Sequence, residues 1–423
     1  MRLVTVSMLL AAAVFAQEAQ LKQLASPSAA QRRIAAAALG AMGKDAAKAV
    51  PALVKALEDR NGLVRQQVIL ALGEIGDERA VDPLAALVAG PDLRTRQLAA
   101  RSLGRIGGRA EPVLRAALTA KQSATRAAAA LGLTELKTKT DATRAALAKA
   151  MTDSSPLVRA QAAWALLPAT AARDILFQVL DQDEVESSRL AVQALGDAGA
   201  RDETTARRVV KALQSKHEIV RWYAGASLRR FTAVLPAVRK DIYAALTTAS
   251  FPVRAGLAGS LQPIAQDHLG ELVKLLAEHD DVAPHIVLAC EKCAEDAATA
   301  VVPLLAHESG AVAARAAHFF AALGKKGRPH VEALKKAVGR PEIAVRVYAA
   351  RAVWELTRDA GAVYKAFEAG LTAPKAVRLL AIESLGSMGS TALDAMPGLE
   401  NAAQSEDKQI ARAAKVAIRR IQR

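Results

Sequence analysis

The chain has 423 residues, of which 52% are hydrophobic and only 3% aromatic, and it carries a formal net charge of +15. Ala, Leu and Val supply most of the apolar residues, while the long β-branched or aromatic runs of a sheet protein are missing, so the composition predicts an all-α protein. The positive charge favours anionic partners. No segment after the N-terminal region holds about 18 uncharged apolar residues, which argues against a membrane span.

The first residues, MRLVTVSMLLAAAVFAQEAQ, have the layout of a secretory signal peptide. Arg2 precedes an apolar run over residues 3–15, and the small residue Ala16 stands before the polar Gln17. We therefore expect residues 1–16 to be removed on export and the mature chain to be secreted or periplasmic. The residue directly after the cleavage point is not a cysteine, which argues against a bacterial lipid anchor. The alternative interpretation of this segment is a frayed first helix.

One motif recurs along the rest of the chain, as VRQQVILALGEIGD (64–77), TRQLAARSLGRIGG (95–108) and VRLLAIESLGSMGS (377–390). Its apolar residues fall three and four positions apart, which predicts one stripe along a helix. The arginine of the first copy and its equivalents give anchors at Arg32, Arg65, Arg96, Arg126, Arg159, Ser188, Arg221, Arg254, Ala283, Ala316, Arg346, Arg378 and Arg412. These anchors lie 29 to 34 residues apart, and a period of this size indicates a solenoid.

Proline and glycine mark where the helices of each repeat begin and end. A proline near the first helical turn, where the N–H has no intrahelical partner, opens the second helix at Pro51, Pro83, Pro112, Pro236, Pro303, Pro329 and Pro397. A glycine pair ends the first helix in six repeats: the first glycine lets a neighbouring helix approach closely, and the second suits a left-handed helix cap. The pairs are Gly40/Gly43, Gly73/Gly76, Gly104/Gly107, Gly196/Gly199, Gly324/Gly327 and Gly386/Gly389.

A helical hairpin of about 30 residues cannot bury its apolar stripe alone, whereas stacked copies share one core. The sequence therefore predicts an α-solenoid, a superhelix of about twelve stacked helical hairpins plus a closing helix. We expect residues 17–423 to form this solenoid as one domain.

The pattern VR…A…ALG.IG followed by AV.PL…L resembles the HEAT repeat, in the short form similar to phycobilisome-lyase HEAT-like repeats, over about residues 25–423. The resemblance implies a scaffold rather than a particular activity, with second helices lining a concave face. It also implies that the recurring Arg joins an Asp of the preceding turn, as Asp59, Asp92 and Asp153 would allow for the arginines that follow them. We interpret the ten anchor arginines as structural, because a charge fixed in most repeats belongs to the scaffold.

Charge and tryptophan are unevenly distributed along the repeats. Residues 201–254 hold eleven Lys and Arg against four Asp and Glu, whereas residues 267–308 hold two Lys against nine Asp and Glu. The predicted partner-binding residues are Arg207, Arg208, Lys211, Arg239, Lys240 and Lys274, all on second helices. The alternative is a solvated polar face.

The three tryptophans, Trp164, Trp222 and Trp354, lie in repeats without the glycine pair. We interpret them as core residues that fill space where the small glycines are missing.

The sequence CEKC (290–293) suggests a redox or metal site. With the anchor at Ala283, however, Cys290 takes the core position of Leu72, and Cys293 likewise falls at a core position, so both are predicted to be buried packing residues. Six of the seven histidines lie between residues 268 and 330, interleaved with the acidic block, but no ligand spacing occurs and we expect no metal site.

No nucleophile, phosphate loop or triad pattern stands out, so we expect no enzyme and no cofactor. Deoxyhypusine hydroxylase, a HEAT-like iron enzyme, needs four His-Glu pairs where this chain has two. The sequence predicts an exported, monomeric scaffold whose concave face binds a protein or peptide with an acidic surface. An anionic polymer, either envelope polysaccharide or nucleic acid, is the alternative, and a lyase-type enzyme is less favoured; export disfavours nucleic acid.

Overall fold

The structure, a computed structural model, describes residues 17–197 and 202–423. These residues form α-helices and short 3-10 helices, and no strand occurs among them, so the all-α prediction is confirmed. The expected signal peptide, residues 1–16, lies outside the described residues. Within the described parts of the chain, every helix is too short or too polar to cross a bilayer.

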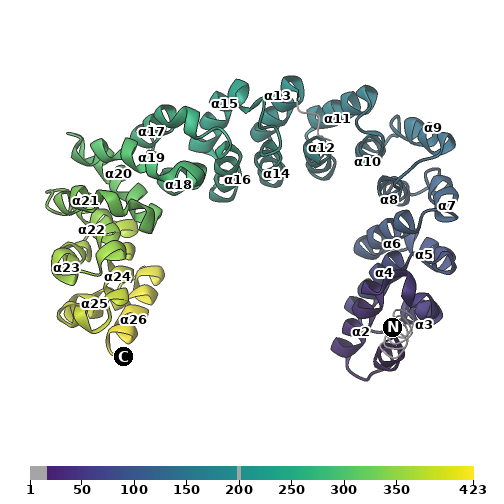
Figure 1. The fold of residues 1–423 in the computed structure, drawn as a ribbon, viewed down its shortest axis with the longest axis horizontal. Helices are drawn as coiled ribbons and strands as arrows, with labels where there is room; N and C mark the ends of the chain where they lie inside the picture. Colours follow the sequence, from purple (N-terminus) through teal and green to yellow (C-terminus); the bar gives the residue numbers. More distant parts are fainter. Residues whose placement is uncertain (1–16, 198–201) are drawn as a thin grey trace, which may run out of the picture. The chain divides into compact units, whose positions relative to one another are not determined.

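The chain divides into two compact units. The first comprises Met1–Ala200 with Ser215–Val220, and the second comprises Arg201–Gln214 with Arg221–Arg423. Within each unit the helices alternate between two layers (Figure 1). We call the helices with the recurring motif the first layer and the helices that follow them the second layer. In chain order the described residues give twelve such pairs followed by α26 (Lys408–Ile421), so the predicted solenoid is confirmed.

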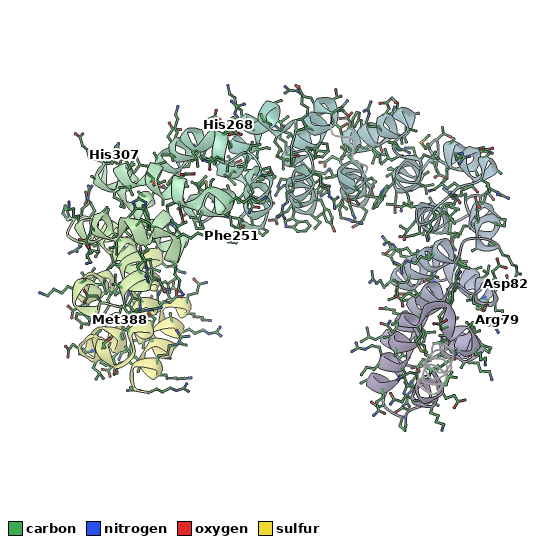
Figure 2. The ribbon with its side chains drawn as sticks, in the orientation of Figure 1. Arg79, Asp82, Phe251, His268, His307 and Met388 are labelled. Atoms are coloured by element: carbon green, nitrogen blue, oxygen red, sulfur yellow. The ribbon has the colours of Figure 1, made fainter. Side chains whose placement is uncertain are left out.

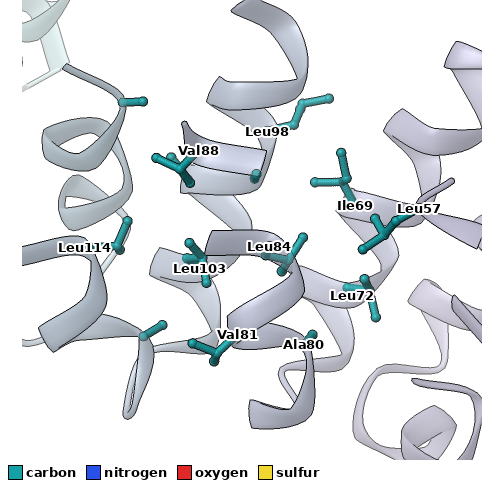
Figure 3. Close-up of a cluster of buried hydrophobic side chains, with 14 of the residues drawn as sticks. Leu57, Ile69, Leu72, Ala80, Val81, Leu84, Val88, Leu98, Leu103 and Leu114 are labelled. Carbon is teal, nitrogen blue, oxygen red and sulfur yellow. The ribbon is translucent and has the colours of Figure 1, made fainter. Parts of the chain in front are cut away.

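The first layer of the first unit consists of α2 (Ala29–Ala41), α4 (Gly62–Ile75), α6 (Leu93–Ile106), α8 (Ser123–Thr134), α10 (Pro156–Leu166) and α12 (Val185–Asp197). Its second layer consists of α3 (Val50–Ala56), α5 (Val81–Val88), α7 (Ala110–Ala117), α9 (Asp141–Ala150) and α11 (Thr170–Gln182), with 3-10 helices η1 (Gly43–Ala49) and η2 (Glu78–Ala80). The core lies between the layers: Leu72 of α4, Leu84 of α5 and Leu103 of α6 are fully buried (Figure 3).

The first layer of the second unit consists of α14 (Glu218–Leu228), of which residues 221–228 belong to this unit, α16 (Phe251–Leu261), α18 (Ala283–Ala289), α20 (Gly310–Leu323), α22 (Ile343–Thr357), α24 (Lys375–Met388) and α26. Its second layer consists of α13 (Glu203–Lys211), α15 (Leu235–Thr248), α17 (Leu269–Glu278), α19 (Ala294–Val301), α21 (Val331–Val338), α23 (Ala360–Gly370) and α25 (Met396–Ala403). The 3-10 helices of this unit are η3 (Ala212–Gln214), η4 (Gln266–His268), η5 (Glu291–Cys293), η6 (Val302–Ala306), η7 (Gly324–His330) and η8 (Gly389–Ala395).

First-layer helices approach their neighbours closely at glycine. A Cβ atom at Gly73 would lie 2.8 Å from the Cα atom of Ser102 on the next first-layer helix, and one at Gly104 would lie 2.0 Å from the carbonyl oxygen of Gly132. The first glycine of these pairs is therefore required by helix packing, as predicted. Figure 1 shows the first layer on the inner side of the curve within each unit.

The second glycine of most described pairs has a positive φ. Gly76 takes the left-handed helical conformation predicted for a cap, with φ +73° and ψ +24°, whereas Gly107 has φ +66° and ψ −144° and lies outside it. Each follows the last residue of its first-layer helix. The pair after α20 differs, because there the first glycine, Gly324, has the positive φ of +61°. The helix ends earlier than the sequence repeat suggested, so this repeat has a different register.

Three anchors are corrected by the hydrogen bonds at the helix starts. Arg65 donates its backbone N–H to the carbonyl of Asn61, the N-cap residue four positions earlier. The residues that make the equivalent bond in α18, α20 and α26 are Ile286, Ala313 and Ala411, rather than Ala283, Ala316 and Arg412. Arg412 is therefore exposed on its helix and does not have the structural role predicted for it.

The recurring arginine closes the turn that precedes its own helix. The guanidinium of Arg65 donates to the carbonyl of Asp59 at 2.7 Å, and that of Arg96 donates to the carbonyl of Gly90 at 2.7 Å. Equivalent bonds to turn carbonyls are made by Arg32, Arg126 and Arg159, while Arg254 donates to the carbonyl of Thr247 in the last turn of α15. Because a buried carbonyl without a partner destabilises the fold, these contacts support the structural interpretation of the arginines.

Two of the arginines also join successive repeats, with a different partner from the predicted one. Arg126 donates to both carboxylate oxygens of Asp153, at 2.7 and 2.8 Å, and Arg32 binds Asp59 in the same way. The carboxylate of each Asp thus binds the arginine of the preceding repeat, whereas its backbone carbonyl accepts from the arginine that follows it. Asp92 instead accepts the backbone N–H of Thr95 at 2.7 Å as the N-cap of α6.

We expect Arg126→Met to lower the free energy of unfolding by ~1–3 kcal/mol, because it leaves the half-buried Asp153 carboxylate without its partner. The hydrogen bonds from Arg126 lower the pKa of Asp153 below its ordinary value. This contribution to stability is present above the ordinary Asp pKa of about 4 and is lost as the pH falls through the lowered pKa. Urea denaturation of parent and variant between neutral and acidic pH measures both effects.

Arg144→Met is the matched control, because Arg144 pairs with Asp141 on the surface of the same unit. We expect a change within about 0.5 kcal/mol, as is usual for exposed ion pairs. Equal losses for the two variants would contradict a structural role for the Arg126–Asp153 pair.

Candidate interaction surface

The six basic residues predicted to bind a partner lie on three successive second-layer helices of the second unit. α13 carries Arg207, Arg208 and Lys211, α15 carries Arg239 and Lys240, and α17 carries Lys274. The helices α13 and α15 pack against each other, so five of the six residues lie on neighbouring helices, as the sequence predicted.

Three of these residues are paired with glutamates of the same unit. Arg207 binds Glu203 of its own helix at 2.6 Å, and the Lys274 ammonium lies 3.8 Å from the carboxylate of Glu278. Arg239 makes the strongest contact, because its guanidinium donates to both carboxylate oxygens of Glu271, from the neighbouring repeat, at about 3.0 Å.

The Arg239–Glu271 pair joins α15 to α17. The hydrogen bonds from Arg239 lower the pKa of Glu271 below its ordinary value, so the pair is ionised at neutral pH. On the same helix as Arg239, the Tyr243 side chain is 9% exposed, and burial raises its pKa to about 12. Arg239 therefore contributes to the contact between repeats as well as to the surface charge.

The sequence assigned these basic residues to the concave surface, and the structure corrects this. Within the second unit the first-layer helices lie on the inner side of the curve, and α13, α15 and α17 lie on the outer side (Figure 1). The reason is the close packing of the first layer, which narrows each repeat on that side. The six basic residues are therefore on the outer surface of the second unit.

Exposed apolar side chains gather on the first layer instead. Among the described residues, eight of the nine large apolar side chains that are exposed belong to first-layer helices: Ile34, Leu63, Leu93, Ile219, Trp222, Phe251, Leu288 and Val416. The ninth, Leu393, belongs to η8 of the second layer. An apolar bias confined to one layer points to a surface that binds another molecule, since single exposed apolar residues would otherwise be scattered.

Three of these residues lie on the successive first-layer helices α14, α16 and α18, and we call Trp222, Phe251 and Leu288 the apolar strip. Phe251 is 69% exposed and Trp222 is 38% exposed. Figure 2 shows Phe251 on the first-layer side of the second unit, away from His268 on the second-layer side. The helices that carry the strip pack together: Gly256 of α16 lies against the Trp222 carbonyl, and Gln262 of α16 donates to the Leu288 carbonyl at 3.0 Å.

A buried histidine supports the base of the apolar strip. The His285 ring packs edge-on against Phe251, with 5.0 Å between ring centroids, and the residue is only 3% exposed. Burial lowers the pKa of His285 below its ordinary value, so the ring is neutral at neutral pH. His285 is therefore a packing residue here, and it holds the exposed phenyl ring in place.

The CEKC cysteines are buried, as predicted. Cys290 is 1% exposed and Cys293 is 8% exposed, and both are free thiols. Burial raises the pKa of each thiol above its ordinary value. Thiolate is the reactive form, so this environment suppresses reactivity.

We expect folded protein to react slowly with a thiol-specific dye and to label fully in denaturant. Cys290→Ala should lower the free energy of unfolding by ~1–3 kcal/mol by leaving a small cavity. Timed labelling followed by mass measurement tests the first expectation and denaturation tests the second. Rapid labelling of the folded chain, in protein shown by mass to contain no disulfide, would contradict the packing role.

The histidines of the acidic block do not converge. His268 precedes α17 and His279 follows it, at opposite ends of one helix, while His307 follows η6 in the next repeat. Across the described residues, no three His, Cys, Asp or Glu side chains gather in an arrangement that could hold a metal ion.

The tryptophans differ in role. Trp354 is 6% exposed and donates its indole N–H to the Ser387 hydroxyl at 2.9 Å, which agrees with the predicted repacking between repeats. Trp222 is exposed and belongs to the apolar strip. The sequence offered one signal for the strip that we missed: Phe251 occupies the first helical position of its repeat, where an apolar side chain contributes nothing to the predicted stripe.

Comparison with known proteins identifies the repeat. A family profile described as HEAT repeats matches residues 18–104 and 85–167, which confirms the HEAT-repeat resemblance for this part of the chain. No curated protein matches the sequence.

Solved structures of a karyopherin share the fold. The karyopherin Kap121p bound to Ste12p is 12% identical, with a TM-score of 0.53 over 95% of this chain and 52% of that chain. Kap121p bound to Pho4p gives a TM-score of 0.51 at 12% identity over the same shares. The CpcE–CpcF complex of phycocyanin lyase from a Nostoc species is 22% identical, with a TM-score of 0.35 over 54% of this chain and 92% of that chain. The chain thus spans about half the length of Kap121p.

Proposed function

We propose that this HEAT-repeat protein is an exported, non-catalytic scaffold that binds a protein or peptide partner through its first layer. The observation that carries the proposal is the distribution of exposed apolar side chains, eight of nine of which lie on first-layer helices among the described residues. Exposed apolar patches on soluble proteins mark interaction surfaces, because covering them removes apolar area from water.

The apolar strip has the properties of an interface centre. Trp and Phe supply large, rigid contact areas, and such side chains dominate the energy of many interfaces. The helices beneath the strip are fixed by backbone contacts and by the buried His285, so little order has to be gained on binding. Exposed apolar side chains on three successive helices suit an extended protein or peptide segment better than a compact ligand.

The fold comparison is consistent with this role. Kap121p structures hold protein ligands, among them Ste12p and Pho4p. At 12% identity the likeness extends to the fold alone, so the partner must follow from the surface of this chain. The six outer basic residues then provide an electrostatic field that favours acidic partners and raises association rates rather than forming the centre of the interface.

We expect the double variant Trp222→Asp/Phe251→Asp to abolish capture of the partner from an extract of the source organism while leaving thermal stability nearly unchanged. The reason is that both side chains are exposed, so two new carboxylates alter binding more than folding. Affinity capture with purified bait, compared by mass spectrometry, gives the readout. Leu393→Asp is the matched control, because Leu393 is 53% exposed but lies in the second layer.

A second variant for the same capture experiment carries Glu in place of five outer basic residues, which are Arg207, Arg208, Lys211, Arg239 and Lys240. If this variant loses its partner while the strip variant keeps it, the outer basic surface is the binding site and the first-layer proposal is wrong. If binding weakens uniformly and steeply with salt concentration, the ligand is an anionic polymer. A protein interface with an apolar centre should lose mainly association rate.

Export has its own test. We expect the chain isolated from its source to begin at Gln17 and to be recovered outside the cytoplasm, because residues 1–16 have the layout of a cleaved signal peptide. Mass measurement of the intact chain from fractionated cells gives both results. A chain that retains Met1 and stays with the cytoplasmic fraction would contradict export without affecting the binding proposal.

A further inference from the structure

A groove of about 640 Å³ runs along the first layer of the second unit, between α22, α24 and α26. Its base is made of small residues, since a Cβ atom at Gly386 would lie 2.9 Å from the Cα atom of Ala417. Leu379 of α24 and Val416 of α26 give the groove an apolar surface, and Val416 is 41% exposed. A volume of this size is typical of ligand-binding clefts.

Three arginines line the groove, against one acidic residue. Arg351 comes from α22, Arg412 and Arg420 come from α26, and Glu383 of α24 is the acid. Arg412 and Arg420 are exposed, and neither makes an ion pair within the part of the chain that the structure describes. Their guanidinium groups are therefore available to a ligand.

The helix α26 is unusually basic as a whole. Residues 408–423 contain six Lys and Arg and no Asp or Glu. Arg412, Val416 and Arg420 are spaced four residues apart, which places them in one stripe on the side of the helix that lines the groove. The apolar residues Ile410 and Ile421 are buried on the opposite side against the core, so the basic face is not used for folding.

The side of the groove opposite α26 is held in place before any ligand binds. Arg351 is fixed by Glu355 at 2.7 Å on the same helix. Where α22 meets α24, the indole of Trp354 donates to the Ser387 hydroxyl, which in turn donates to the Ser384 carbonyl at 2.7 Å. A groove whose walls are fixed loses little conformational entropy on binding.

We propose that this groove binds an extended acidic segment of a protein partner. Carboxylates of the segment pair with Arg412 and Arg420, each of which can donate two hydrogen bonds to one carboxylate, and an apolar side chain of the segment covers Leu379 and Val416. The inference rests on the proposed function, since the groove belongs to the same first layer, and it adds the chemical class of the segment that is bound.

The composition of the groove favours an acidic peptide over a nucleic acid or polysaccharide. The exposed Val416 contributes binding energy only to a ligand with apolar groups. Glu383 opposes a continuous line of phosphates, whereas a peptide can place a backbone N–H or a neutral residue there. None of the described residues that line the groove is aromatic, so bases would find no stacking surface.

The test uses the full-length mature protein and a short fluorescent peptide of repeated Glu-Glu-Leu units, followed by fluorescence anisotropy. The parent should bind this peptide and should not bind the same peptide built from Lys-Lys-Leu or Gln-Gln-Leu. Arg412→Glu/Arg420→Glu should weaken binding by about ten-fold or more, since it reverses both carboxylate-binding groups. Val416→Gln should weaken it several-fold without changing the charge.

Lys415→Glu/Arg419→Glu is the matched control, because it makes the same charge change on the same helix at residues that do not line this groove. It should change the affinity less than about three-fold, the effect of long-range charge at moderate salt. Circular dichroism melting of all variants checks folding, and Arg412→Ala/Arg420→Ala replaces the reversal should the latter unfold.

Three results would overturn the inference: no binding of the acidic peptide, equal losses for the groove and control variants, or preferential binding of a labelled oligothymidylate. Each of these leaves the scaffold proposal standing, because that proposal is tested by partner capture with the apolar strip variant. Conversely, failure of the strip variant to affect capture leaves the peptide titration unaffected.

Discussion

The close approach of the first-layer helices is the constraint on which the rest of the structure depends. Where Gly73 meets Ser102 and Gly104 meets Gly132, no larger side chain fits between the helices. Neighbouring second-layer helices make fewer contacts with one another than first-layer helices do, so each repeat is narrower on its first-layer side. Stacking such repeats curves each unit toward the first layer, and this small rotation per repeat determines which side chains face the inner surface.

The recurring arginine supplies hydrogen-bond donors to backbone carbonyls that this stacking of helices leaves without partners. A stack of short helices has many helix ends, and the carbonyls of each connecting turn must find donors. Arg65 and Arg96 satisfy the carbonyls of the turn before their own helices, while Arg126 additionally binds Asp153 of the next repeat. One side chain thereby closes a turn and, in some repeats, fixes the spacing to the neighbouring repeat.

Much of the fold could be predicted from the sequence, because the burial problem repeats with a fixed period and the Arg and Gly positions mark it. The prediction failed where the arginine is missing: at α18 and α20 the residues equivalent to Arg65, which are Ile286 and Ala313, lie three residues away from the expected anchors Ala283 and Ala316. The sequence pattern could not predict on which layer the candidate site lies. A periodic sequence shows two apolar stripes per repeat, but it does not show which layer packs more closely, because that packing depends on contacts between repeats.

The two kinds of arginine in this chain illustrate how register decides function. Arg65 is the fourth residue after its N-cap and is directed back to the turn, whereas Arg412 is the fifth residue after Asp407. One residue rotates a side chain by about 100° around a helix. Arg412 therefore cannot reach the turn carbonyls and lines the groove with Arg420 instead. A residue that the motif would assign to the scaffold becomes available for binding because the motif is displaced by a single position.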